Sequence, residues 1–183
     1  MKKIIYILML IPLLIGCAPV ASASIGSSCE SLQPTPGDVQ YALNFGSSLF
    51  TEAVWVRSYS VYEQEAIVNW THRSVAALSD VSIQLFCNDN GTADLELYYN
   101  TDTLKEKFSN YDSINIVTSC KNKDIVLYEL DAVEEGSNYT IHQWFQPLNK
   151  TRLLSVVIVF PKEETVLTTK YSEQLFPDLP ACK

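Results

Sequence analysis

The stretch YTIHQWFQPLNKTRLLSVVIVFP, residues 139 to 161, predicts a β-hairpin. Its arms, residues 139–145 and 152–160, are rich in the β-branched and aromatic side chains that favour strands. The polar segment QPLNKT joins the arms, and Pro161 ends the second one because proline cannot donate to a strand ladder. Antiparallel strand pairs are therefore expected in the C-terminal half of the chain.

Other segments also have the pattern of strands. Residues 79–87 alternate apolar and polar side chains, NDNG supplies a turn, and residues 95–99 alternate back, which predicts a second hairpin. An alternation that begins at Val39 and ends at Phe45 predicts a strand starting at residue 38. Further strands are predicted over residues 54–62, 66–70, 113–118 and 124–131.

Two segments have helical spacing. Residues 100–111, NTDTLKEKFSNY, place Leu104 and Phe108 four positions apart behind Asp102, the predicted N-cap. Residues 162–176, KEETVLTTKYSEQLF, begin with acidic side chains and precede Pro177, as expected of a helix. Their apolar residues fall at i, i+4 and i+8: Leu167, Tyr171 and Leu175.

The order of these elements predicts an α+β fold, a mostly antiparallel β-sheet covered by a few helices, in one domain over residues 38–183. The run SVVIVFP and the following helix ending YSEQLFPDLPAC resemble the end of PsbP-like α/β/α sandwich domains, over about residues 110–180. Those domains occur in exported bacterial lipoproteins and in photosynthetic accessory subunits. The resemblance implies a non-enzymatic accessory or binding role and carries over no functional residue. The strands of the first half also suit an immunoglobulin-like sandwich.

The first residues predict export. Lys2 and Lys3 precede an apolar run, residues 4–15, that is shorter than the roughly 20 residues a membrane-spanning helix needs. The sequence LIGC, residues 14–17, resembles the lipobox of bacterial lipoproteins. It predicts a signal peptide over residues 1–16 and a Cys17 thioether-linked to a diacylglycerol, which anchors the protein to the cell membrane outside the cytoplasm.

The segment after the anchor leaves an alternative open. Residues 17–37 are rich in Ala, Ser, Pro and Gly and predict a flexible tether. Ala21-Ser22-Ala23 fits ordinary signal peptidase, so a secreted protein cleaved after Ala23 is the alternative. Such a protein would carry glycans on four Asn-x-Thr sequons, which in a lipoprotein we expect to be polar turn residues: Asn69, Asn90, Asn138 and Asn149.

Cysteine parity supports the lipobox. Five cysteines leave one without a partner in an oxidising compartment, whereas a lipid on Cys17 leaves four, enough for two disulfides. Four cysteines allow three connectivities, among which the sequence does not choose. We expect one disulfide to tie the two ends of the domain and the other to link two strand ends: Cys29–Cys182 and Cys87–Cys120.

The acidic composition excludes several classes of partner. The formal net charge is −8, whereas nucleic-acid binding needs a basic surface. The same charge opposes electrostatic docking on anionic lipid, so attachment to the membrane would depend on the acyl chains.

Few residues suggest chemistry. His72 and His142 are the only histidines, and no His-x-x-x-His, Cys-x-x-Cys or Gly-x-Ser-x-Gly spacing accompanies them. NDNG does not fit the spacing of a calcium loop, and the acidic residues between 124 and 135 fit a solvated strand and loop. We predict no catalytic residue, no metal site and no cofactor. A histidine that meets a carboxylate and a hydroxyl in one cleft would argue for an enzyme instead.

The aromatic residues allow two interpretations. Trp55, Trp70 and Trp144 could stack on a carbohydrate, but each lies in an apolar run, which favours core packing. The sequence therefore predicts a non-catalytic envelope lipoprotein that acts as a binding or accessory module for a protein or small molecule. The alternatives are an exported hydrolase with an unidentified site and the secreted glycoprotein.

Overall fold

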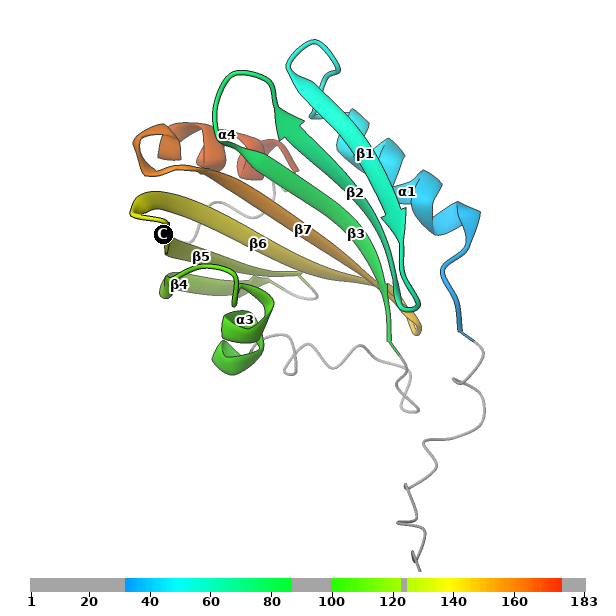
Figure 1. Ribbon diagram of the computed structural model, residues 1–183. Helices are drawn as coiled ribbons and strands as arrows, with labels where there is room; N and C mark the ends of the chain where they lie inside the picture. The colour runs from blue at the N-terminus through cyan, green and yellow to red at the C-terminus, as the bar shows by residue number, and fades with distance from the viewer. Residues whose placement is uncertain (1–31, 87–99, 123–124, 176–183) are drawn as a thin grey trace, which may run out of the picture.

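The computed structural model describes residues 32–86, 100–122 and 125–175, which form a curved sheet with helices on both faces (Figure 1). The seven strands have the order β1-β2-β3-β7-β6-β5-β4, and every neighbouring pair is antiparallel. The predicted α+β fold, mostly antiparallel sheet covered by helices, is confirmed. The strands are β1 (Trp55–Val61), β2 (Glu65–His72), β3 (Leu78–Leu85), β4 (Ser113–Asn122), β5 (Ile125–Glu134), β6 (Ser137–Asn149) and β7 (Arg152–Pro161). The helices are α1 (Pro36–Ser47), α3 (Thr101–Lys107), α4 (Thr165–Leu175) and the 3₁₀ helix η1 (Lys162–Glu164).

The sheet separates two hydrophobic layers, and helices cover each of them. Helices α1 and α4 pack on one face of the sheet, here called the α1/α4 face, over a cluster that includes all three tryptophans. Helix α3 packs on the opposite face, here called the α3 face, through Leu104 and Phe108. The predicted core role of Trp55, Trp70 and Trp144 is confirmed, because each is at most 1% exposed.

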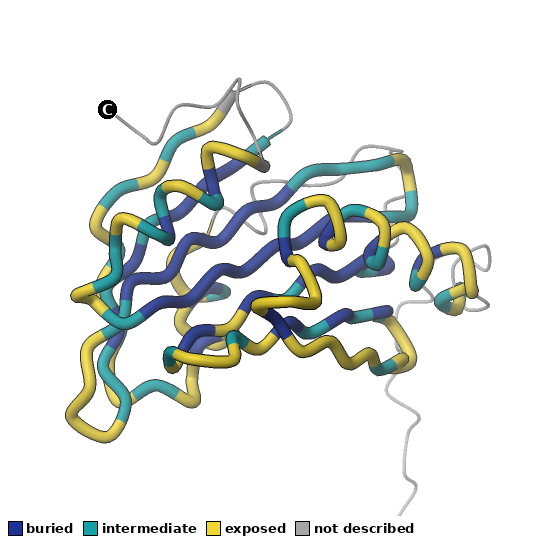
Figure 2. Tube along the Cα trace, turned by 90° about the horizontal axis from the view of Figure 1, so that it is seen from above, coloured by how far each residue is buried: buried dark blue, intermediate teal, exposed yellow. Residues whose placement is uncertain are grey.

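The central strands are buried along most of their length (Figure 2). Every residue of β7 from Leu153 to Phe160 is buried, because side chains on both of its faces lie beneath a helix or another core residue. This double burial explains why the run SVVIVF is apolar without alternating. The predicted hairpin of residues 139–161 is confirmed, although β6 extends to Asn149 and the turn is shorter than expected.

The strand predicted from residue 38 is wrong: this segment forms helix α1, and the helix includes the last residues of the predicted tether. Thr35 accepts a hydrogen bond from the Asp38 backbone, and the Asp38 carboxylate accepts one from the Thr35 backbone. This capping box, with Pro36 in the first turn, is a strong helix start. Ala42 and Gly46, four positions apart, are buried on the side of α1 that faces the sheet. This helical spacing competes with the strand-like alternation of Val39 to Phe45.

The other predicted elements differ mainly at their ends. The strands predicted from residues 54, 66, 79, 113 and 124 correspond to β1, β2, β3, β4 and β5. Helix α3 is capped by Asn100, whose side chain accepts from the Asp102 backbone, so Asp102 is not the N-cap. The helix predicted from residue 162 begins as η1 and continues as α4. The turn NDNG and the returning strand, residues 88–99, lie outside the described residues, as does the N-terminal segment up to residue 31.

Candidate functional site

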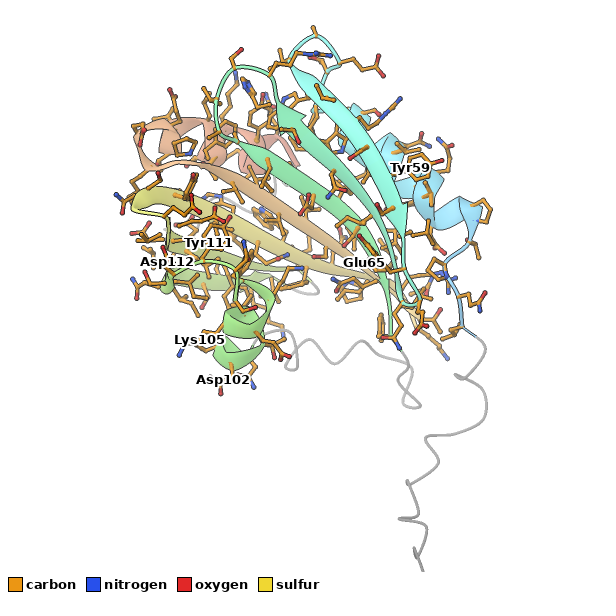
Figure 3. The ribbon with its side chains drawn as sticks, in the orientation of Figure 1. Tyr59, Glu65, Asp102, Lys105, Tyr111 and Asp112 are labelled. Atoms are coloured by element: carbon orange, nitrogen blue, oxygen red, sulfur yellow. The ribbon has the colours of Figure 1, made fainter. Side chains whose placement is uncertain are left out.

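A polar cavity of about 200 Å³ lies on the α3 face, between α3 and strands β2, β3 and β7. Ligand pockets commonly have volumes of about 300–1,000 Å³, so a cavity of this size suits only a small ligand. Figure 3 shows Glu65 on the β2 side of this face and Tyr111 beside α3. Four polar or charged side chains in its lining come from separate elements: Glu65, Asp80, Lys107 and Ser155. Convergence of polar groups in one hollow is the usual arrangement of a small-molecule site.

Cross-strand amides hold the two carboxylates in place. In the β2–β3 ladder Asn69 lies opposite Asp80, and Glu65 lies opposite Gln84. Asn69 Nδ2 donates to Asp80 Oδ1 over 2.7 Å, and Gln84 Nε2 donates to Glu65 Oε1 over 3.1 Å. Three cross-strand pairs lie between these two, and the middle one, Ile67 with Ser82, faces the same side of the sheet, so the two carboxylates flank the Ser82 position.

Lys107, the last residue of α3, supplies a positive charge. Burial around its ammonium lowers the pKa, and the negative charges of Glu65 and Asp80 oppose this without cancelling it. Burial likewise raises the pKa of Asp80, against the Asn69 hydrogen bond and the Lys107 charge. The Lys107 side chain is exposed as a whole, so its charge lies at the rim of the cavity, where solvent still reaches it. Charged groups displaced from their ordinary pKa in a cavity are typical of functional sites.

Two aromatic rings line the same cavity, and a buried amide contacts its lining. The rings of Phe108 and Tyr111 meet edge to face with centroids 6.2 Å apart, and both line the cavity. Burial, with a smaller effect from the Glu134 charge, raises the pKa of Tyr111 to about 12, so its phenol remains a neutral hydrogen-bond donor. Ser155, which lines the cavity, accepts a hydrogen bond on Oγ from Gln143 Nε2 over 3.1 Å. Gln143 Oε1 is buried and has no hydrogen-bond partner among the described residues.

Lys107 also borders a neighbouring cavity. This second hollow, of about 230 Å³, is lined by Gln84, Glu106 and Phe145 among others. The Lys107 side chain therefore lines both hollows.

A third hollow lies on the other face of the sheet and has a different character. It has a volume of about 440 Å³ and lies between the start of α1 and edge strand β1. Its lining is mainly apolar and carries no charged side chain: Pro34, Thr35, Pro36, Val39, Gln40, Leu43, Tyr59 and Val61. It lacks the convergent charged groups of the α3-face cavity.

One histidine does meet a hydroxyl and a carboxylate. On the α1/α4 face, His142 Nδ1 lies 2.6 Å from Ser172 Oγ, and His142 Nε2 lies 4.0 Å from Glu129 Oε1. Ser172 and His142 are 1% and 2% exposed. Desolvation lowers the pKa of His142 to about 4, so the imidazole is neutral at neutral pH. The trio is packed in the interior beneath α4 rather than in an open cleft, and its hydroxyl also accepts from Trp144 Nε1.

Other residues singled out by the sequence lie apart from the cavity. His72 packs edge-on against Trp55 and accepts hydrogen bonds from the backbone of the following turn. Asp131, in the acidic stretch, forms an ion pair with Lys162. Asn69 lies inside β2 and not in a turn, contrary to expectation. Within the described residues, no three His, Cys, Asp or Glu side chains come together as a metal site would require.

The predicted disulfides can be placed only in part. Cys120 lies in β4, half-buried against the core of the α1/α4 face, and it is disulfide-bonded. The other four cysteines lie outside the described residues: Cys17, Cys29, Cys87 and Cys182. The pairing and the lipid attachment therefore remain predictions.

Sequence reasoning did not identify the cavity residues. One signal was present: Asp80 is a carboxylate within a strand whose neighbours are apolar or small, where an unpaired charge is costly. Glu65 and Lys107 resembled ordinary surface charges. Only the fold shows that these three residues share one cavity.

Comparisons with protein-family models, with curated proteins and with solved structures found no match to this chain. No helix within the described residues is long and apolar enough to cross a bilayer. The function must therefore be inferred from the geometry of the α3-face cavity.

Proposed function

We propose that this protein is a non-catalytic binding module that takes a small polar ligand into the α3-face cavity. One observation carries the proposal: two carboxylates, an ammonium and a phenol from separate elements line one hollow of the sheet. Partly desolvated charges lower stability unless they are well paired, so a fold under selection for stability alone would favour uncharged side chains there. Ligand binding gives a reason for their presence.

The proposal includes a location. The LIGC box at residues 14–17 supports export and acylation of Cys17, and the following residues would link the anchor to the domain. Mass spectrometry of the mature N-terminus tests this. A diacylglyceryl-modified Cys17 is the expected result, whereas an unmodified terminus at Ser24 would instead establish the secreted form.

Ligand binding can be tested with a defined panel of amino acids, amines, organic acids, sugars and nucleosides, by saturation-transfer NMR on the purified mature protein. Leu78 lines the cavity and is 38% exposed, so Leu78→Trp would fill the cavity mouth. Val166 is 79% exposed on α4, which makes Val166→Trp a matched control on the opposite face. We expect at least one compound to bind in a manner that Leu78→Trp abolishes and Val166→Trp preserves. If no compound shows this dependence, the binding proposal is wrong.

The buried trio favours a second candidate, a hydrolase in which Ser172 is the nucleophile and His142 the base. This candidate requires α4 to move, because the Ser172 hydroxyl is shielded from solvent. Hydrolysis of p-nitrophenyl acetate by the wild type and by Ser172→Ala separates the two functions. The binding proposal expects equal rates, whereas a loss of more than tenfold in the variant would favour the hydrolase.

A further inference from the structure

We propose that the ligand of the α3-face cavity is a small organic ammonium ion, which replaces the Lys107 ammonium beside Asp80 and Glu65. This inference rests on the proposed binding function and specifies the chemical class of the ligand. It is carried by the charge balance of the cavity, by the orientation of its carboxylates and by the position of Lys107.

The charge balance favours a cation. Glu65 and Asp80 contribute two negative charges to the lining and Lys107 contributes one positive charge. The formal charge of the whole chain, −8, acts in the same direction at long range. An anionic ligand would have to approach two carboxylates with a single lysine to offset them.

The carboxylates are oriented to accept further hydrogen bonds. Amides on the partner strand donate to one oxygen of each, Asp80 Oδ1 and Glu65 Oε1. A carboxylate oxygen has more than one acceptor position, so these amides fix the groups without saturating them. An ammonium ion brings donors alone and therefore complements such a site.

In the absence of a ligand, the Lys107 ammonium supplies the positive charge that the organic ammonium ion would bring to Asp80 and Glu65. Its charge acts on both Asp80 and Glu65, but Lys107 forms no ion pair with either among the described residues. Lys107 also lines the cavity of about 230 Å³, as does Glu106, so we expect its side chain to turn toward that cavity when a competing cation binds. A competing cation could then occupy its position.

The remaining walls fit the body of an organic cation rather than a bare ion. The rings of Phe108 and Tyr111 present surfaces that attract cations. Apolar side chains from the sheet complete the lining and would contact a short hydrocarbon chain: Ile67, Leu78, Val157 and Val159.

Three probes of equal chain length test the charge preference: butylammonium chloride, butanol and sodium butyrate, titrated at constant ionic strength into the ¹⁵N-labelled mature protein. We expect butylammonium to shift the amide signals around Asp80 and Ser82 and to bind at least tenfold more tightly than butanol. Asp80→Asn should weaken butylammonium binding at least fivefold, and Glu65→Gln serves as a second variant should Asp80→Asn fail to fold.

Lysine variants test the displacement. Lys107→Met should tighten butylammonium binding several-fold because it removes the internal competitor. Lys105→Met removes the same charge from α3, at a residue that points away from the sheet in Figure 3, and should change the affinity less than twofold. Equal effects of the two variants would mean that only overall charge matters and would overturn the proposal.

The outcomes also separate this inference from the proposed function. If butyrate or butanol binds in the cavity more tightly than butylammonium, the ligand class is wrong while the binding function stands. If none of the three probes binds, the ammonium proposal is likewise overturned, and the panel with Leu78→Trp decides the binding function independently.

Discussion

Arg152 forms a bidentate ion pair with Asp38, which lies 114 residues earlier in the sequence. Arg152 Nε donates to Asp38 Oδ1 over 2.9 Å, and Arg152 Nη2 donates to Asp38 Oδ2 over 3.2 Å. Asp38 is also the third residue of the α1 capping box, in which it accepts from Thr35. One carboxylate thus fixes both the start of α1 and its attachment to the start of β7. We expect this contact to matter more than an ordinary surface ion pair, because both side chains are largely buried.

Asp38→Ala should lower the free energy of unfolding by about 2–3 kcal/mol, since it leaves the Arg152 charge without its partner. Burial opposes ionisation of Asp38, but hydrogen bonds from Arg152 and Thr35 outweigh it and hold the pKa below the ordinary value of 3.8. The stabilisation is therefore complete above pH 3.8 and is lost as the pH falls through the lowered pKa. Urea unfolding at several pH values measures this, with Asp102→Ala, in the first turn of α3, as the control. Similar losses in the two variants would contradict the special role of Asp38.

Gly46→Ala should destabilise the protein even though alanine favours helices. A Cβ on Gly46 would lie 2.6 Å from Trp70 Nε1 and 2.8 Å from Cε2, and the Trp70 ring is fully buried and cannot withdraw easily. Overpacking of this kind costs about 1–3 kcal/mol. At Gly37, in the same helix, the added carbon would meet only Thr35 Oγ1 at 3.4 Å, so Gly37→Ala should be close to neutral. Thermal unfolding of both variants, with tryptophan fluorescence as the probe, tests the difference.

Acid should destabilise the fold through His142. Its pKa is about 4 in the folded protein because of desolvation, against an ordinary value of 6.5. The unfolded chain therefore binds more protons between these values, so stability falls as the pH drops from 6.5 to 4 and then levels off. The full effect is about 3 kcal/mol.

The variant His142→Gln should remove this part of the pH dependence when unfolding is measured with urea from pH 7 to pH 4. Glu129 faces the other ring nitrogen, and burial raises its pKa, which gives stability a pH dependence of the opposite sign. Glu129→Gln separates that contribution. An unchanged slope in His142→Gln would show that the imidazole is not the titrating group.

A substitution in the turn between β5 and β6 should make the protein more stable. Glu135 and Gly136 have φ angles of 50° and 79°, and Glu134 pairs with Ser137 across a two-residue loop. Such loops favour Asn-Gly because asparagine tolerates a positive φ better than glutamate does. Glu135→Asn should therefore raise the free energy of unfolding by about 0.5–1 kcal/mol. Glu134→Asn, one position earlier in the strand, should bring no gain, and a gain of equal size there would point to charge rather than backbone conformation.

Reduction should lower the melting temperature by several degrees, because each disulfide contributes about 2–4 kcal/mol. The predicted pairs are Cys29–Cys182 and Cys87–Cys120, and of these four residues only Cys120, in β4, lies within the described part of the chain. Peptide mapping of the unreduced mature protein identifies the partners. Four free thiols would refute the disulfide prediction, and a different pairing would refute the connectivity alone.

Sequence patterns alone predicted β1 to β7, helix α3 before β4, helix α4 after β7 and the buried tryptophans, because alternation and helical spacing reflect local geometry that a buried surface enforces. The prediction was wrong at α1, where the alternation of Val39 to Phe45 competes with the four-residue spacing of Ala42 and Gly46, and the capping box of Thr35 and Asp38 decides in favour of a helix.

The candidate site could be located only from the positions of the strands and helices in space. Asp80 and Glu65 face the same cavity because the β2–β3 register places them on one side of the sheet, and Lys107 joins them because α3 packs across that side. These residues are distant along the chain. Unlike the apolar residues of one helix or strand face, the charged residues of one cavity follow no regular spacing in the sequence that would reveal which of them lie together. Register and helix docking are set by the burial of the whole apolar surface, which no short stretch of sequence contains.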